Sequence, residues 1–248
     1  MSRYATQKWE FFRAVRDGDT ATVRRMLYDN NRLLNIVSDD DMRPLFIAAE
    51  NGNLELVRFL IEAGADINIQ DEDGWAPLSG ATSRGHIEVV RLLIDAGAEV
   101  NIQEGRGDTS LNIAAKNGYI QIVRLLIGAG ADLNIEHGSG WTPLTSAASN
   151  GHLQVVQLLI NAGANINPEG DDNSPFFVAV SNNRVEIARL LLENGADINK
   201  TVNIFGMRPL TALSMAMTNQ RAMEMRGMTD DIAKAKDCLL YTSDAADE

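Results

Sequence analysis

The side chains that most often carry catalysis or bind metals are few and scattered in this sequence. The histidines are His86, His137 and His152, and the single cysteine is Cys238. His86 and His152 each follow a glycine in the same local pattern, which indicates a hydrogen-bonded packing role. No histidine or cysteine stands at a metal-ligand spacing, and no nucleotide-binding, serine-hydrolase or zinc-protease motif occurs. We therefore expect no catalytic residue, no metal site and no cofactor, and we expect the protein not to be an enzyme.

Carboxylates form the densest clusters of ionisable groups. These clusters lie at residues 39–41, 71–73 and 171–172. A calcium-binding loop would alternate its ligands around a glycine and end in a glutamate, and these clusters lack that spacing. Two interpretations stay open: solvated turn residues, or an acidic ridge for a basic partner. The glycine-rich residues 104–108 resemble a phosphate cradle only weakly, because glycine also serves turn geometry.

Two tryptophans form part of a column of residues at one repeated position. Each member of the column stands two residues before a proline or the residue that replaces it. The members are Met42, Trp75, Asp108, Trp141, Asn173 and Met207. Tryptophan is enriched at binding hot spots because it offers a large, rigid contact area with one hydrogen-bond donor. Trp75 and Trp141 therefore either contact a partner or pack over the neighbouring loop, and both roles are compatible.

The column belongs to an internal repeat with a period of 32 or 33 residues. One series of landmarks is the glycine of each Gly-Ala pair, at Gly64, Gly97, Gly130, Gly163 and Gly195; another is Pro44, Pro77, Ser110, Pro143 and Pro175. Each period predicts two short helices, such as residues 143–151 and 152–161. Proline suits the first helical turn, a wide apolar face buries the second helix, and glycine ends it.

These residues resemble the ankyrin repeats. The match is carried by DEDGWAPL at residues 71–78 and GHIEVVRLLI at residues 85–94. The resemblance implies an all-α ankyrin-repeat solenoid of about seven helix-turn-helix repeats joined by β-hairpin-like loops. The expected domain covers residues 8–237. Its expected repeats are 8–37 (degenerate), 38–70, 71–103, 104–136, 137–168, 169–200 and 201–237 (irregular).

The last segment, residues 238–248, does not fit a repeat. Its sequence CLLYTSDAADE resembles a translated transposon sequencing adapter, and a natural acidic tail is the alternative. We interpret this segment as an artefact and expect the native chain to continue beyond Asp237.

Composition limits the classes of partner. The 248-residue chain carries a formal charge of −12, which disfavours nucleic acids and anionic membranes. It contains no apolar run long enough for a bilayer or a secretory signal. We therefore expect a soluble, cytoplasmic and monomeric protein.

The family resemblance implies a non-catalytic protein–protein interaction module that binds a partner protein on its concave surface. The alternative is a regulatory or targeting region of a longer, truncated multidomain protein, including an enzyme. The predicted contact residues comprise the column Met42, Trp75, Asp108 and Trp141. They also include polar residues at the ends of the first helices: Glu50, Asn51, Ser83, Arg84, Lys116, Asn117, Ser149 and Asn150.

Overall fold

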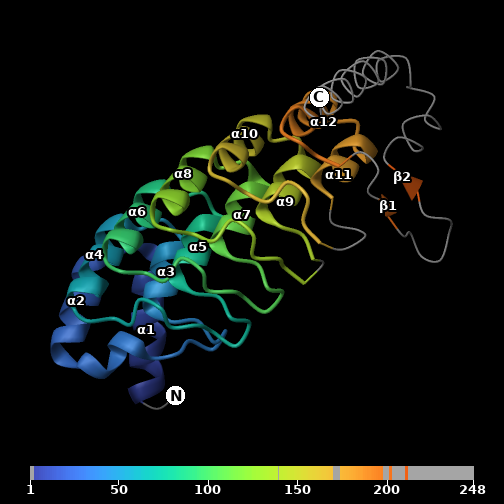
Figure 1. The fold of residues 1–248 in the computed structure, drawn as a ribbon. Coiled ribbons are helices and arrows are strands. Elements are labelled where there is room, and N and C mark those ends of the chain that lie inside the picture. Colours follow the sequence, from blue (N-terminus) through green and yellow to red (C-terminus); the bar gives the residue numbers. More distant parts are fainter. Residues whose placement is uncertain (1–2, 139, 170–173, 198–200, 203–209, 212–248) are drawn as a thin grey trace, which may run out of the picture. The chain divides into compact units, whose positions relative to one another are not determined.

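The computed structural model describes residues 3–138, 140–169, 174–197, 201–202 and 210–211. The chain divides into two compact units, Met1–Pro143 and Leu144–Glu248. In each unit, short helices follow one another in pairs (Figure 1).

The first unit contains four helix pairs. Its helices are α1 (Arg3–Asp17), α2 (Thr20–Asp29), the 3-10 helix η1 (Asn31–Asn35), α3 (Pro44–Glu50), α4 (Leu54–Glu62), α5 (Pro77–Ser83), α6 (Ile87–Asp95), α7 (Ser110–Asn117) and α8 (Ile120–Gly128). The first helix of one pair packs beside the first helix of the next, as α3 does on α5 and α5 on α7. The second helices α4, α6 and α8 form a parallel series of contacts.

Among its described residues, the second unit contains two further pairs and a short strand pair. Its elements are α9 (Pro143–Asn150), α10 (Leu153–Asn161), α11 (Pro175–Ser181), α12 (Val185–Glu193), β1 (Thr201–Val202) and β2 (Leu210–Thr211). The two strands are antiparallel, with Thr201 opposite Thr211. The helix pair predicted at residues 143–161 is confirmed by α9 and α10.

The start of each first helix follows from one local sequence feature. Proline occupies the first turn of α3, α5 and α11, where its missing N–H group removes no helical hydrogen bond. Helix α7 begins at Ser110 instead, and there the Thr109 hydroxyl accepts a hydrogen bond from the Asn112 backbone N–H at 3.3 Å. The capping threonine thus compensates for the absent proline.

The core repeats with the sequence. Each second helix of the first unit after α2 buries three apolar side chains at positions i, i+1 and i+4, which lie on one helical face. They are Leu56, Val57, Leu60, Val89, Val90, Leu93, Ile122, Val123 and Leu126, all at most 2% exposed. Small buried residues such as Ala81 and Ala114 let the first helices approach closely. This regular core holds the loops before each first helix in register.

The predicted all-α fold and its hairpin-like loops are confirmed. From β1 to the end of the chain only residues 201–202 and 210–211 are described, so the seventh repeat and the segment 238–248 stay predictions. Asp171, Asp172, Asn173, Met207 and Cys238 also lie outside the described residues.

Candidate functional site

Four successive loops of the first unit precede first helices and share one backbone pattern. We call them the first (38–43), second (71–76), third (104–109) and fourth (137–142) hairpins. In each, the N–H of the first residue donates to the carbonyl of the fifth. The N···O distances are 2.8 Å for Ser38–Met42, 3.0 Å for Asp71–Trp75, 2.9 Å for Glu104–Asp108 and 3.1 Å for His137–Trp141. Each of these four members of the predicted column therefore closes a hairpin.

Consecutive hairpins are joined through their backbones. The Gly105 N–H donates to the Asp73 carbonyl at 2.6 Å, and the Gly138 N–H donates to the Arg106 carbonyl at 2.6 Å. The Gln70 side-chain amide adds a bridge, because its Nε2 donates to Gly74 O at 2.7 Å and to Gln103 O at 3.2 Å. These bonds fix the spacing between one hairpin and the next.

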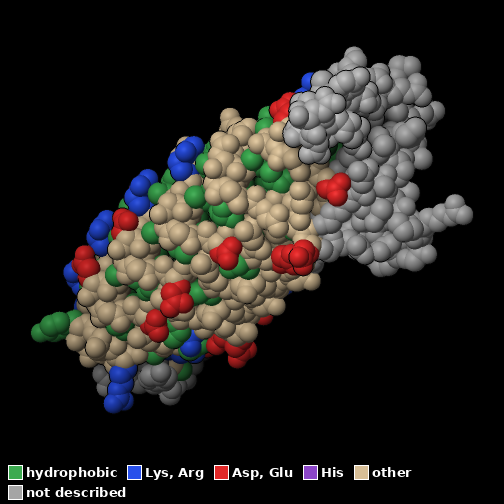
Figure 2. All heavy atoms as spheres, viewed as in Figure 1, with side chains coloured by type: hydrophobic (Ala, Val, Ile, Leu, Met, Phe, Trp, Pro, Cys, Tyr) green, Lys and Arg blue, Asp and Glu red, His purple; other side chains and the backbone are tan. Residues whose placement is uncertain are grey.

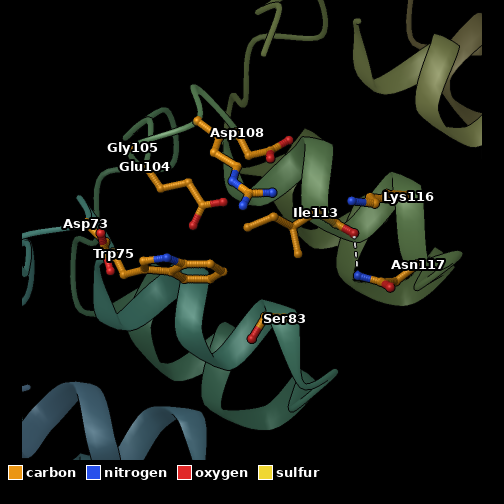
Figure 3. Close-up of a pocket in the computed structure, with 10 residues that line it drawn as sticks. Asp73, Trp75, Ser83, Glu104, Gly105, Asp108, Ile113, Lys116 and Asn117 are labelled. Atoms are coloured by element: carbon orange, nitrogen blue, oxygen red, sulfur yellow. Dashed lines mark hydrogen bonds between the residues drawn. The ribbon is translucent and has the colours of Figure 1, made fainter. Parts of the chain in front are cut away.

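A cavity of about 570 Å³ lies beside the second and third hairpins and helices α5 and α7 (Figure 3). This volume is within the range of about 300–1,000 Å³ found for ligand pockets. Its lining combines aromatic, apolar and charged groups: Asp73, Trp75, Ser83, Glu104, Gly105, Arg106, Asp108, Ile113, Lys116 and Asn117. The cavity thus brings together Trp75, Ser83, Asp108, Lys116 and Asn117 of the predicted contact residues.

The Trp75 indole forms one wall of this cavity. Figure 3 shows the Glu104 carboxylate pointing toward the Trp75 ring, with Ile113 of α7 beside them. Trp75 is half-buried and Ile113 is buried. Trp75 therefore packs against its own scaffold and also presents part of its ring to the cavity, while its contact with a partner stays a prediction.

Glu104 behaves differently from the residues at its position in the preceding hairpins. The Ser38 hydroxyl accepts hydrogen bonds from the N–H groups of Asp40 and Met42. The Asp71 carboxylate accepts them from the N–H groups of Asp73 and Trp75. Within the described chain, Glu104 Oε2 is buried and has no hydrogen-bond partner. Leaving such a group unsatisfied costs about 1–3 kcal/mol.

This environment changes the ionisation of Glu104. Burial raises its pKa from an ordinary value of 4.5 to about 7, and the negative charges of Asp108 and Asp71 act in the same direction. Arg106 and Lys116 lower the pKa but do not outweigh burial. Near neutral pH the carboxyl is consequently a mixture of its protonated and ionised forms.

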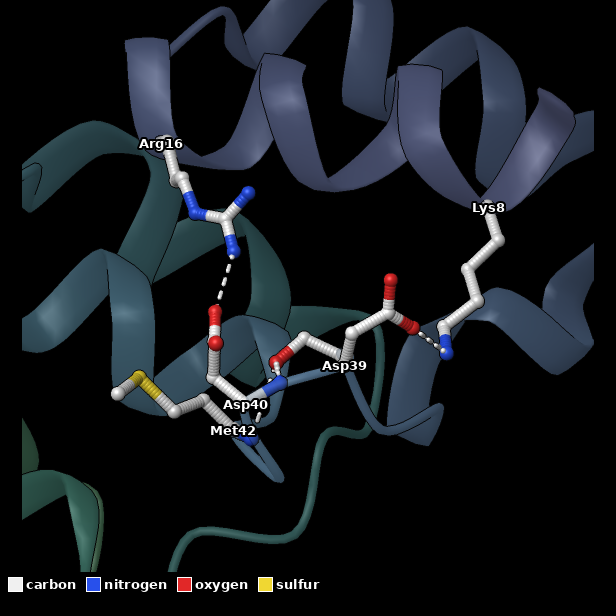
Figure 4. A network of polar contacts seen from close by, with 6 residues as sticks. Lys8, Arg16, Asp39, Asp40 and Met42 are labelled. Atoms are coloured by element: carbon white, nitrogen blue, oxygen red, sulfur yellow. Dashed lines mark hydrogen bonds and ion pairs between the residues drawn. The ribbon is translucent and has the colours of Figure 1, made fainter. Parts of the chain in front are cut away.

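The acidic cluster of the first hairpin is in a different state. Lys8 Nζ of α1 contacts Asp39 Oδ1 at 2.7 Å, and Arg16 Nη2 contacts Asp40 Oδ2 at 3.1 Å (Figure 4). Asp41 Oδ2 accepts a hydrogen bond from the Glu72 N–H. This part of the predicted acidic ridge is therefore already paired within the protein.

The other predicted contact residues divide between several local arrangements. Glu50 and Arg84 form an ion pair at 2.8 Å, and Met42 lies in the first hairpin beside the ion-paired Asp40 (Figure 4). The Trp141 ring lies near His137, with centroids 6.2 Å apart. The rest belong to helix ends: Asn51, Ser149 and Asn150 are half-buried or exposed. Asn150 Nδ2 donates to Ser146 O in α9, as Asn117 Nδ2 does to Ile113 O in α7.

His86 contacts the last residue of helix α3. Its Nε2 lies 2.9 Å from the Glu50 carbonyl oxygen, so the expected hydrogen-bonded packing role is confirmed. Among the residues with described placement, no group of three or more His, Cys, Asp or Glu side chains is arranged to hold a metal ion.

Exposed basic side chains recur on the second helices. Figure 2 shows them in a row over α2, α4, α6 and α8; exposed Arg58, Arg91 and Arg124 belong to the last three of these helices. Of the Glu–Arg neighbours on these helices, Glu88 and Arg91 are within 3.8 Å. Helices α4 and α6 also carry acidic residues, among them Glu55 and Glu88, so the row is not a continuous basic surface.

Sequence reasoning did not select Asp73, Glu104, Gly105, Arg106 or Ile113 as contact residues. Glu104 could have been found by aligning the first residues of the hairpins. Ser38 and Asp71 have side chains short enough to cap their own turn, whereas glutamate has an additional methylene group. Asp73 belongs to an acidic cluster and residues 104–106 to the glycine-rich segment noted above, but neither pattern predicts that they line a cavity together with Ile113 of α7.

The repeated helix pairs and the cavity beside their hairpins are those of a helical-repeat protein. The family model described as ankyrin repeats (3 copies) matches residues 11–104 and 107–202. The chain belongs to the ankyrin repeat family. No curated protein matches it. In the part of the chain that the structure describes, no helix has both the length and the apolar character needed to cross a bilayer.

Proposed function

We propose that this chain is a non-catalytic protein–protein interaction module whose partner binds at the cavity beside Trp75. The observation that carries the proposal is the cavity itself, where the repeat register brings Trp75, Asp108 and Lys116 together. Ankyrin repeats generally serve as protein-interaction modules, and such repeats bind through surfaces formed by consecutive units.

Binding accounts for this cavity better than catalysis does. Glu104 has a pKa of about 7, which suits an acid–base catalyst. Within the described residues, however, Glu104 hydrogen-bonds to no nucleophile or second acid–base group. The half-buried Trp75 supplies instead the kind of rigid aromatic surface that anchors a partner.

The proposed contact surface extends from the cavity to its neighbours in the first unit. It comprises Met42, Glu50, Asn51, Trp75, Ser83, Arg84, Asp108, Lys116, Asn117 and Trp141. Ser149 and Asn150 belong to the second unit and stay predictions. The partner is a protein, and we propose that the module acts as a monomer.

The test compares three tryptophan truncations. The partner is captured with the native chain from extracts of its source cells, purified, and titrated by calorimetry against the native chain, Trp75→Ala, Trp141→Ala and Trp9→Ala. Trp9 is 59% exposed on α1 and does not line the cavity, so Trp9→Ala is the matched control. Thermal unfolding of each variant checks that it is folded.

A hot-spot tryptophan contributes about 2 kcal/mol or more on truncation, which corresponds to roughly a 30-fold rise in Kd. We expect this loss for Trp75→Ala, a smaller loss for Trp141→Ala and an unchanged Kd for Trp9→Ala. Native affinity in both Trp75→Ala and Trp141→Ala would remove the proposed surface.

A further inference from the structure

The cavity contains a hydrogen-bond acceptor that the protein itself does not satisfy. Glu104 Oε2 is buried without a partner among the described residues, although Ser38 and Asp71 at the same hairpin position each accept two backbone N–H groups. Because Oε2 is buried, a ligand reaches it only when the Glu104 side chain turns toward the cavity, and a donor there would satisfy a group that otherwise lacks a hydrogen bond. The ionised carboxyl needs a donor-bearing ligand, whereas the protonated form could itself donate a hydrogen bond.

The neighbouring groups favour a donor with a positive charge. Asp73 and Asp108 line the same cavity as Glu104, and neither side chain forms an ion pair or hydrogen bond within the described chain. Figure 3 shows the flat Trp75 ring on the side of the cavity toward which Glu104 points. The face of an indole ring attracts cations. A cation placed there would meet both an aromatic face and a carboxylate.

Neither basic residue of the lining forms an ion pair with Glu104 within the described chain. Arg106 lines the cavity but is not within ion-pair distance of Glu104 or Asp108 in the described structure. Lys116 is exposed on α7 and has the smallest influence on Glu104 of the charged residues that act on it. The charged side chains of the lining comprise three carboxylates and two cations, so the balance of charge also favours a cationic guest.

We propose that the cavity accepts one arginine side chain from the partner, with its guanidinium paired to Glu104 and stacked on Trp75. This inference rests on the proposed function. Arginine fits better than lysine because its planar guanidinium can stack on an aromatic ring and pair with a carboxylate at the same time.

Binding of an arginine side chain is coupled to the protonation of Glu104. The free carboxyl has a pKa of about 7, raised by burial and by Asp108 and Asp71 and lowered by Arg106 and Lys116. A guanidinium binds the ionised carboxylate, so a proton competes with the ligand. Between pH 8 and pH 6 the ionised fraction falls about tenfold, and the affinity should fall by up to about the same factor.

The experiment uses a small probe on the full chain. Nα-acetyl-arginine N-methylamide is titrated into the protein, and binding is followed by the NMR signal of the Trp75 indole N–H, assigned with Trp75→Phe. The neutral isostere Nα-acetyl-citrulline N-methylamide, the lysine analogue and the glutamate analogue are titrated in parallel. A single side chain should bind with a Kd on the order of 1 mM.

We expect the arginine probe to bind at least tenfold more tightly than the citrulline probe at pH 8 and more tightly than the lysine probe. Glu104→Gln should weaken the arginine probe about tenfold and flatten its pH dependence. The control Glu72→Gln alters an exposed acid outside the cavity lining and should leave binding unchanged.

Equal binding of the arginine and citrulline probes, tighter binding of the lysine or glutamate probe, or native affinity in Glu104→Gln would overturn the proposal. These failures can be distinguished from failure of the proposed function. If partner binding needs Trp75 but no arginine probe binds, the interaction module stands and its arginine specificity is wrong. If the probe binds but the Trp75→Ala and Trp141→Ala variants keep native affinity for the partner, the cavity is a cation site and the proposed module surface is wrong.

Discussion

The first hairpin and the second and third hairpins have the same backbone pattern but opposite electrostatic states. In the first, Lys8 and Arg16 of α1 pair with Asp39 and Asp40. In the second and third, Asp73 and Asp108 line a cavity and their side chains have no partner within the described chain. The carboxylates are therefore ion-paired in the first hairpin, whereas Asp73 and Asp108 form no ion pair within the described chain.

This difference arises from what lies next to each loop. Residues of α1 and α3 are in contact, and α1 is long enough, at Arg3–Asp17, to bring two basic side chains to the first hairpin. The second hairpin is followed instead by another hairpin, whose nearest contribution is backbone, the Gly105 N–H. Identical loop geometry thus gives two different surfaces because the neighbouring element differs.

The largest expected effect concerns the left-handed residue of each hairpin. This residue is Asp41 in the first hairpin, with φ of 58°, and Gly74 in the second, with φ of 81°. A Cβ on Gly74 would lie 2.9 Å from Gly105 N and 3.0 Å from Glu104 Cα. Gly74→Ala should therefore destabilise the protein by about 3 kcal/mol, through left-handed strain plus a backbone clash.

The matched control is Gly64→Ala. Gly64 has φ of 89°, and a Cβ on this residue would meet no atom within 4 Å. The control should therefore cost only the conformational strain of about 1–2 kcal/mol. Urea unfolding of both variants measures the difference, and hydrogen exchange at the Gly105 N–H reports the junction directly. Equal destabilisation would show that the hairpins are not tightly coupled there.

The next effect concerns the residue that caps each hairpin. Asp71→Ala removes a charged acceptor for the Asp73 and Trp75 N–H groups, at 3.1 and 2.8 Å, and should cost about 2 kcal/mol. Ser38→Ala removes a neutral acceptor for two such groups at 3.2 and 3.1 Å, and should cost about 1 kcal/mol. Chemical denaturation compares the two, and Asp71→Asn should recover part of the loss. A larger cost for Ser38→Ala would contradict this ranking.

The sequence was sufficient to predict most of the fold. The 33-residue period located the helix pairs, and proline marked where α3, α5 and α11 begin. The same register selected Trp75, Ser83, Asp108, Lys116 and Asn117, which line the cavity. These features follow from backbone position, which the repeat specifies.

The rest of the site depends on side-chain conformation in irregular loops. The repeat period does not determine whether the side chain at this position caps its own turn, as Asp71 does, or lines the cavity, as Glu104 does. It also does not determine that Glu50 and Arg84 pair with each other, since the pattern places both only at the ends of first helices. Competition between neighbouring side chains decides these contacts, and the pattern of residue types in one repeat does not contain that information.

A smaller effect is expected from pH at Glu104. Its pKa is raised to about 7, so between pH 4.5 and 7 the folded protein retains a proton that the unfolded chain releases. Stability therefore falls as pH rises through this window. Because the side chain is partly exposed, solvent screening reduces the loss to about 1 kcal/mol.

The Glu104→Gln variant has no ionisable side chain at this position, so it should not lose stability as the pH rises through this window. The variant should match the native protein near pH 4 and exceed its stability by about 1 kcal/mol at pH 8, as measured by urea unfolding at both values. Glu72→Gln, on the exposed part of the second hairpin, should follow the native pH profile. If Glu104→Gln shows the native fall in stability, another group causes the pH dependence.

The smallest effect is expected at the ion pair of the first hairpin. The hydrogen bond and positive charge of Lys8 hold the pKa of Asp39 below its usual value of 3.8, yet the Asp39 side chain is 93% exposed. Its depressed pKa adds stability above pH 3.8 that is lost as pH falls through the folded value. Exposure and salt screening make that contribution slight.

Lys8→Met should raise the pKa of Asp39 toward 3.8, as followed by the NMR shift of its carboxyl carbon during titration. Arg16→Met should move it less, because Arg16 pairs with Asp40 and is the weaker influence on Asp39. If Asp39 titrates identically in the native chain and Lys8→Met, α1 does not neutralise the first hairpin. The contrast with the second and third hairpins would then have to arise from the burial of Glu104 alone, because neighbouring cations would distinguish none of the loops.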